Sequence, residues 1–185
     1  MARKGIELQA SGGFPLYLAV LLLLVPLRWV LAVLTAAVIH ELFHMAALSL
    51  LGHPVHRIYV GLLGARIITE PMPESHEILC ALAGPLGGLA LLTLARWFPA
   101  VSVCALFQSL YNLLPVYPAD GGRALRCGVK LFLPGKTGES VAEALEILVL
   151  AGIVAGGVLG TFRLYLGPAP LLMALLLVFP AVKKK

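Results

Sequence analysis

Residues 29–51 read WVLAVLTAAVIHELFHMAALSLL, an apolar run long enough to cross a bilayer, with three ionisable side chains in its second half. His40 and His44 are four residues apart, so on a helix they share one face and can present two imidazole nitrogens to one metal ion. Glu41 follows the first histidine and is placed to take a proton from a metal-activated water. Ionisable groups are costly in lipid unless they face a cavity and have partners. The stretch therefore predicts a metal site within a membrane, in preference to two unrelated core histidines and a stray carboxylate.

The composition of the whole chain is typical of a polytopic membrane protein. Of its 185 residues, 60% are hydrophobic and 12% are charged, and the mean hydropathy is +0.97. The formal net charge of +5 could suggest a nucleic-acid partner, but the basic residues are scattered between apolar runs. We therefore expect a lipid bilayer as the surroundings and no nucleic acid. Three separate cysteines without a C-x-x-C pattern are predicted to pack in the core.

Six apolar segments predict an all-α polytopic membrane protein with about six transmembrane helices. They are residues 14–27, 29–51, 77–94, about 100–112, about 137–161 and 164–182. The first is short for a full span at ~1.5 Å per residue across ~30 Å of hydrocarbon. We expect a single intramembrane domain over residues 1–185, with no soluble regulatory domain. Its catalytic core is predicted over about 29–130, with peripheral helices at 14–27 and 137–182.

The pattern changes between the second and third helices. Residues 55–60 and 65–69 are β-branched and partly alternating, with two glycines between them, which predicts a short β-hairpin or extended loop at the membrane surface. Its edge, at residues 58–60, could hold an extended peptide, and an ordinary amphipathic connector is the alternative. Three histidines in or near this region are expected to be surface residues and not metal ligands: His53, His56 and His76.

Two glycine-containing stretches lie in the later helices. Residues 83–88, AGPLGG, allow a helix or ligand to come close, or break the helix where it lines a cavity. Residues 112–122, NLLPVYPADGG, contain two prolines and a glycine pair, so we expect broken backbone that is buried in protein or lines a wet cavity.

The segment after this break is strongly charged. Arg126, Lys130 and Lys136 predict a cationic connector. The pattern Ser140-x-x-Glu143 has the form of a capping box that opens the next helix. The glutamates at helical spacing here, Glu139, Glu143 and Glu146, are predicted to form a solvated first turn.

A catalytic zinc ion usually has three protein ligands and one open position, so the two histidines need a further partner. Asp120 is the only carboxylate inside the broken apolar stretch, and the two glycines after it allow close backbone approach. A lone aspartate there would be costly without a cation, so we predict Asp120 as the third ligand of one Zn²⁺ per chain, in preference to a loop cap. The other candidates are Glu70, Glu74 and Glu77 in the polar loop and the glutamates at 139–146. Two histidines, one aspartate and an open position predict a hydrolytic site.

The distribution of basic residues predicts the orientation in the membrane. With six spans, eleven of the fourteen Lys and Arg residues fall on one side, and Arg28, Arg96 and Arg163 fall on the other. Both termini are therefore expected in the cytoplasm. The metal motif then lies near the cytoplasmic end of its helix, and Asp120 lies at the same side of the membrane.

Three motifs together resemble a known family. HELFH at 40–44, AGPL at 83–86 and NLLPVYPADGG at 112–122, in this order, are similar to the motifs of the site-2 protease family of intramembrane zinc metalloproteases. The short form is most similar to the sporulation branch (stage IV sporulation protein FB). The resemblance covers about residues 15–135. Many members carry a polar residue, often Asn, near the position of Gly88, so the role of the segment from Gly84 to Gly88 stays open.

The resemblance implies a role for each site residue. His40, His44 and Asp120 would bind zinc, Glu41 would act as the general base, and Asn112 would help to hold the substrate backbone near the metal. The implied substrate is a membrane-embedded or membrane-tethered protein, cut near the cytoplasmic face in regulated intramembrane proteolysis. By analogy, sigma-factor precursors and anti-sigma factors are expected substrates, a membrane regulatory partner is an open question, and the location is the bacterial cytoplasmic membrane.

Two other functions are compatible with parts of the pattern. A metal transporter could place His, Glu and Asp at membrane depth, but it would be expected to show inverted repeats or paired broken helices, and the sequence has neither. An inactive relative acting as a membrane scaffold is the second alternative. Such a protein would be expected to have lost some of the residues Glu41, His40, His44 and Asp120, all of which this chain retains.

Overall fold

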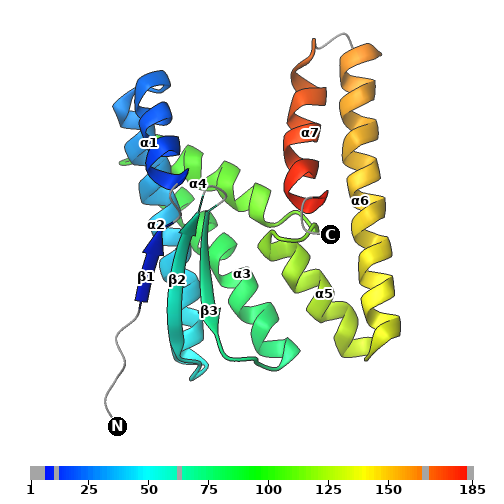
Figure 1. The fold of residues 1–185 in the computed structure, drawn as a ribbon. Helices are drawn as coiled ribbons and strands as arrows, with labels where there is room; N and C mark the ends of the chain where they lie inside the picture. The colour runs from blue at the N-terminus through cyan, green and yellow to red at the C-terminus, as the bar shows by residue number, and fades with distance from the viewer. Residues whose placement is uncertain (1–6, 11–12, 62–63, 164–166, 183–185) are drawn as a thin grey trace. The chain divides into compact units, whose positions relative to one another are not determined.

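The computed structural model describes residues 7–10, 13–61, 64–163 and 167–182. The chain divides into two compact units, Met1–Asn112 and Leu113–Lys185. The prediction of one domain with a core at about 29–130 stays a prediction. Figure 1 labels the elements along the chain.

The first unit combines a helical group with a small sheet. Its elements are β1 (Glu7–Ala10), α1 (Gly13–Leu24), α2 (Leu27–Leu50), β2 (Val55–Gly61), β3 (Gly64–Thr69), α3 (Glu74–Ala90), the 3₁₀ turn η1 (Leu91–Leu94) and α4 (Pro99–Asn112). Helices α2, α3 and α4 pack against one another in pairs. The buried residues of α2 recur at Ala32, Ala36, His40, His44 and Leu48, one stripe at four-residue spacing. The two histidines therefore face the protein interior.

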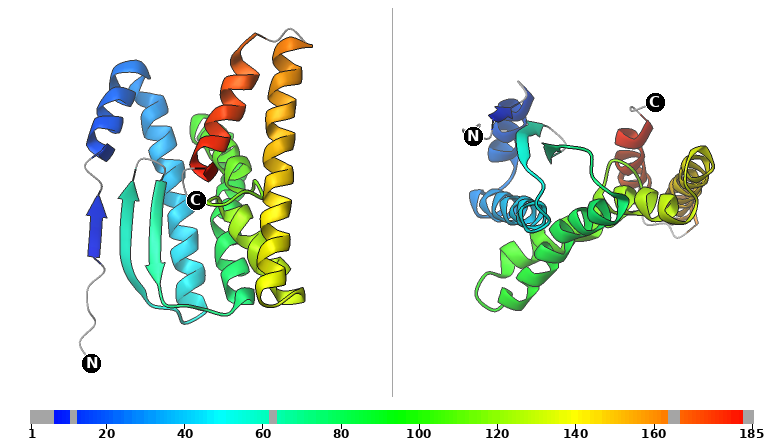
Figure 2. Two further views of the ribbon diagram at one scale, coloured as in Figure 1. Left: turned by 45° about the vertical axis from the view of Figure 1, so that its right-hand side comes forward. Right: turned by 90° about the horizontal axis from the view of Figure 1, so that it is seen from below.

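The sheet confirms the predicted hairpin and adds a strand to it. β2 and β3 are antiparallel neighbours, and β1 pairs in parallel with the other side of β2, from Glu7 opposite Arg57 to Ala10 opposite Val60. The three strands run side by side in the order β1-β2-β3 (Figure 2). The prediction that residues 58–60 offer an open edge is wrong, because β2 is the central strand and both of its sides are paired.

The second unit contains α5 (Asp120–Phe132), α6 (Lys136–Phe162) and α7 (Ala169–Val182). Helix α6 packs against both of the others, and α6 and α7 lie side by side (Figure 1). The expected cationic connector is instead helical: Arg126 and Lys130 lie in α5, which starts inside the predicted break at Asp120, and Lys136 is the first residue of α6. The capping box is also wrong: α6 begins at Lys136, after Gly135 with φ +80°, so Ser140 and Glu143 lie inside the helix.

Three of the described helical stretches are long and apolar enough to cross a membrane: Leu27–Leu50, Glu74–Leu94 and Lys136–Phe162. The mainly helical fold is therefore confirmed, with three candidate membrane spans, whereas the count of six spans is not. The other three predicted spans are shorter helices, with 12 residues in α1 and 14 each in α4 and α7.

Candidate metal centre

The centre is built on the histidine pair of α2. His40 and His44 are 3% and 7% exposed, and their Nε2 atoms lie 3.1 Å apart. The two rings are nearly perpendicular, with an interplanar angle of 82°. The four-residue spacing places both rings on the buried face of the helix, so two nitrogens converge on one point without any distortion of α2.

A backbone carbonyl of α3 orients the second histidine. His44 Nδ1 donates a hydrogen bond of 2.6 Å to the carbonyl oxygen of Cys80, a buried residue. With the proton on Nδ1, the lone pair is left on Nε2, the atom that faces His40. Such contacts fix the tautomer and the ring orientation of a metal-binding histidine.

The glycines of α3 explain how this helix comes so close to α2. A Cβ atom at Gly84 would overlap the His44 imidazole, lying 2.6 Å from its Cε1 atom. A Cβ at Gly87 would overlap the Phe43 ring, and one at Gly88 would overlap the buried hydroxyl of Ser109 on α4. The segment 83–88 stays helical through Pro85 and serves as a close-packing surface for both neighbouring helices. Gly88, where a polar residue is expected from the resemblance, is thus covered by a hydroxyl from α4.

Two further predicted residues lie at this pair within the first unit. Asn112, the last residue of α4, has its Nδ2 atom 3.4 Å from His40 Nε2. Glu41 follows His40 on α2 and is half-buried. The side-chain amide therefore reaches the centre, while the roles of Asn112 in binding substrate and of Glu41 as base stay predictions.

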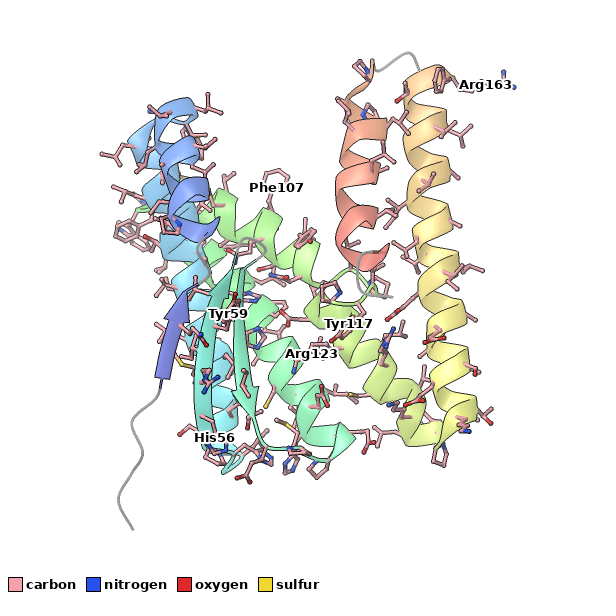
Figure 3. All side chains as sticks on the ribbon, viewed as in Figure 1. His56, Tyr59, Phe107, Tyr117, Arg123 and Arg163 are labelled. Carbon is pink, nitrogen blue, oxygen red and sulfur yellow. The ribbon has the colours of Figure 1, made fainter. Side chains whose placement is uncertain are left out.

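Asp120 belongs to the second unit, where it is the first residue of α5 and is 8% exposed. Its Oδ1 atom lies 3.8 Å from a guanidinium nitrogen of Arg123, one turn further along the helix and labelled in Figure 3. A carboxylate in the first turn of a helix is stabilised by the N-terminal end of the helix dipole. Its assignment as the third ligand stays a prediction.

Arg126 fixes the turn that precedes Asp120. Its guanidinium group donates two hydrogen bonds, of 2.7 and 2.6 Å, to the two carboxylate oxygens of Glu146 on α6. The same group lies 4.7 Å from the centre of the Tyr117 ring, which is labelled in Figure 3. The bond to Glu146 raises the pKa of Arg126 above its ordinary value. The prediction that Glu146 lies in a solvated turn is wrong, because this carboxylate is buried and paired.

Replacing Arg126 by Met is expected to lower the stability of the protein by about 2 kcal/mol, because it leaves the buried Glu146 carboxylate without its partner. Thermal unfolding of the purified protein in detergent measures the change. The matched control is Lys130→Met, whose partner Glu139 is mostly exposed, so a much smaller loss of stability is expected. Adding Glu146→Leu to Arg126→Met should restore most of the stability. Equal losses in the two single variants would contradict the role given to Arg126.

No family model matches the chain, whereas a curated relative and a solved structure are similar to it. A zinc metalloprotease from Methanocaldococcus jannaschii is 29% identical over 105 residues, which cover 49% of this chain. The chain spans only 31% of the length of that relative. The solved site-2 protease from Methanocaldococcus jannaschii matches with a TM-score of 0.67 and 21% identity, covering 100% of this chain and 93% of the solved one. The chain has the fold of a site-2 protease. Both likenesses support the family that the motifs indicated, and the sporulation branch stays a prediction.

Proposed function

We propose that the protein is a zinc-dependent intramembrane endopeptidase. The observation that carries this proposal is the buried histidine pair on the H-E-x-x-H helix, with Nε2 atoms 3.1 Å apart and His44 oriented by the Cys80 carbonyl. Gly84 makes room for the His44 ring, so the close packing of α3 on α2 helps to set the position of this ring. The site-2 protease fold and the similarity to a zinc metalloprotease support the same activity.

The residues fit a single catalytic zinc ion. His40, His44 and Asp120 are all buried, and each offers one ligand atom. Two imidazoles and one carboxylate with one open position form a donor set typical of hydrolytic zinc. When bound, zinc would supply Lewis-acid activation of water and of the substrate carbonyl group.

Two contacts, one in each unit, support Asp120 as the third ligand. In the first unit, Asn112 reaches within 3.4 Å of His40 Nε2. In the second, the start of α5 folds back on the beginning of the preceding turn, since a Cβ at Gly121 would lie 2.7 Å from Leu114 O and would overlap the Leu113 carbonyl. Leu113 is bonded to Asn112, and Gly121 to Asp120. The glycine thus allows the start of α5 to lie against Leu113 and Leu114, the first residues of its own unit.

The reaction that we propose uses the protein's own groups for proton transfer and orientation. Glu41 takes the proton from the attacking water and delivers it to the amide nitrogen that leaves when the C–N bond breaks. Asn112 holds the substrate backbone beside the histidine pair, as its amide position supports.

The substrate would be a membrane-embedded or membrane-tethered protein cut near the cytoplasmic face. Because an α-helix uses its own carbonyl groups in hydrogen bonds, the substrate must unwind before the bond can be attacked. An extended segment can pair with a free sheet edge, and β3 at Gly64–Thr69 offers one, since only its β2 side is paired within the described sheet. Sigma-factor precursors and anti-sigma factors remain the substrates expected by analogy, and a membrane regulatory partner is compatible with this scheme.

For the topology we propose six membrane-spanning segments with both termini in the cytoplasm of a bacterium. The three shorter helices α1, α4 and α7 would then cross the bilayer with tilt or local thinning. The excess of basic residues on one side supports this orientation. Reporter fusions after Arg28, Arg96 and Arg163 should report the extracytoplasmic side, and a cytoplasmic signal at any of them would overturn it.

Zinc content measured on detergent-purified protein tests the proposed centre. We expect about one zinc ion per chain in the wild type, and a strong loss in both His44→Ala and Asp120→Asn, because each removes one of three ligands. Zinc retained in Asp120→Asn would mean that another residue is the third ligand. A wild type without zinc after gentle preparation would overturn the proposed enzyme and favour a scaffold.

A further inference from the structure

A second pair of histidines lies away from the proposed centre. His53 Nε2 and His76 Nδ1 are 2.9 Å apart, and both side chains are half-buried. His53 follows the glycine turn at the end of α2, where Gly52 has φ +78°, and its backbone N–H donates to Leu48 O at 2.9 Å. His76 lies in the first turn of α3. The turn after α2 and the first turn of α3 therefore hold the imidazoles with one nitrogen of each facing the other.

This geometry repeats that of the first pair. The His40 and His44 nitrogens are 3.1 Å apart with rings at 82°, and the His53 and His76 nitrogens are 2.9 Å apart with rings at 70°. Two nitrogens at this separation can both bind one ion at ~2.0–2.1 Å with an angle of roughly 90° between them. The first turn of α3 also carries Glu74 and Glu77, which favour a cation nearby.

We propose that His53 and His76 form a second metal site, which takes a divalent ion of borderline softness such as Zn²⁺, Ni²⁺ or Cu²⁺. Imidazole nitrogens are good ligands for these ions, and neither Mg²⁺ nor Ca²⁺ would prefer them. Two protein ligands leave the remaining coordination positions to water, so this ion exchanges more readily than one held by three protein ligands. The site thus differs from the proposed catalytic centre in both position and affinity.

The position of this second site gives it a structural effect. Residues 53 and 76 flank the whole β2–β3 hairpin in the sequence, so an ion bound to both closes the loop that contains the hairpin. Closing the loop would stabilise the hairpin against local opening, because the ion binds only when the two ends are together. Metal availability would then control the order of the sheet whose edge is proposed to receive the substrate, a consequence that rests on the proposed function.

Equilibrium dialysis of the purified full-length protein against Zn²⁺ tests the site. We expect the wild type to bind one more zinc equivalent than His53→Ala or His76→Ala, with the tightly held zinc unchanged in both variants. The matched control is His56→Ala, a neighbouring exposed histidine that bonds Glu70 at 3.3 Å and should behave as the wild type. The proposal would be overturned if both variants still bound the second zinc equivalent. It would also be overturned if the wild type did not bind this equivalent, and His53 and His76 would then be a hydrogen-bonded pair only. The second zinc equivalent is the difference in bound zinc between the wild type and each variant. This difference does not depend on whether the catalytic centre holds zinc.

Two further measurements use the folded wild type and cover the case of a variant that misfolds. Electron paramagnetic resonance of one added Cu²⁺ equivalent, on protein already loaded with catalytic zinc, should show coupling to two imidazole nitrogens while the bound zinc is fully retained. Limited proteolysis within the hairpin should slow at least several-fold when Ni²⁺ is added to the wild type or to His56→Ala, with no change in His53→Ala. Coupling to no nitrogen, or equal protection in His53→Ala, would overturn the site.

Discussion

Replacing Glu41 by Gln is expected to abolish cleavage of a membrane-tethered substrate while leaving one zinc ion bound. Glutamine has nearly the same size as glutamate but cannot accept the proton of the attacking water. General-base catalysis contributes typically 10²–10⁴-fold to the rate, so the residual activity should fall below a few per cent of the wild type. The substrate is incubated with the enzyme in detergent, and the cleaved fragment is quantified over time.

The position of Glu41 on α2 makes this variant a clean test of its role. Glu41 is half-buried and follows His40 directly, and it is not among the three proposed ligands. Zinc content should therefore equal that of the wild type, whereas the control His44→Ala should lose both zinc and activity. Activity of Glu41→Gln above a few per cent would contradict the base assignment. Loss of zinc in that variant would mean that Glu41 holds the metal instead.

The parts of the site that depend on local spacing could be predicted from the sequence. His40 and His44 share a buried face because four residues nearly complete one helical turn, and any α-helix here would place the two rings on one side. The hairpin followed from the β-branched runs on either side of two glycines. In both cases the residues that decide the structure are close together in the chain.

The parts that depend on distant partners could not be predicted. The glycine pair after Asp120 resembles a helix break, but it lies within the first turn of α5, because the missing side chains make room for Leu113 and Val116 of the preceding turn. The burial of Glu146 depends on Arg126, which lies twenty residues earlier on another helix. Strand β1 depends on pairing with β2, beyond two intervening helices in the sequence. No local pattern contains these contacts.

The glycines of α3 matter most where the neighbouring group cannot move. A Cβ at Gly84 and one at Gly87 would overlap a ring on α2 to a similar degree. The Phe43 ring is 43% exposed, so it can rotate outward to accommodate a methyl group. The His44 ring cannot do so, because it is buried and held by the Cys80 carbonyl at 2.6 Å.

Gly84→Ala is therefore expected to lower zinc affinity at least tenfold, whereas Gly87→Ala should change it much less. The added methyl group must push His44 away from His40, and changes in the contacts that orient a metal-binding histidine typically reduce affinity by 10–100-fold. Competition with a chelator of known affinity measures the zinc dissociation constant, and Gly152→Ala in α6, where a Cβ meets nothing within 4 Å, controls for the glycine-to-alanine change itself. Wild-type affinity in Gly84→Ala would show that α3 can move away from α2. In that case the close packing of the two helices would not set the position of His44. The hydrogen bond to the Cys80 carbonyl alone would then have to set it.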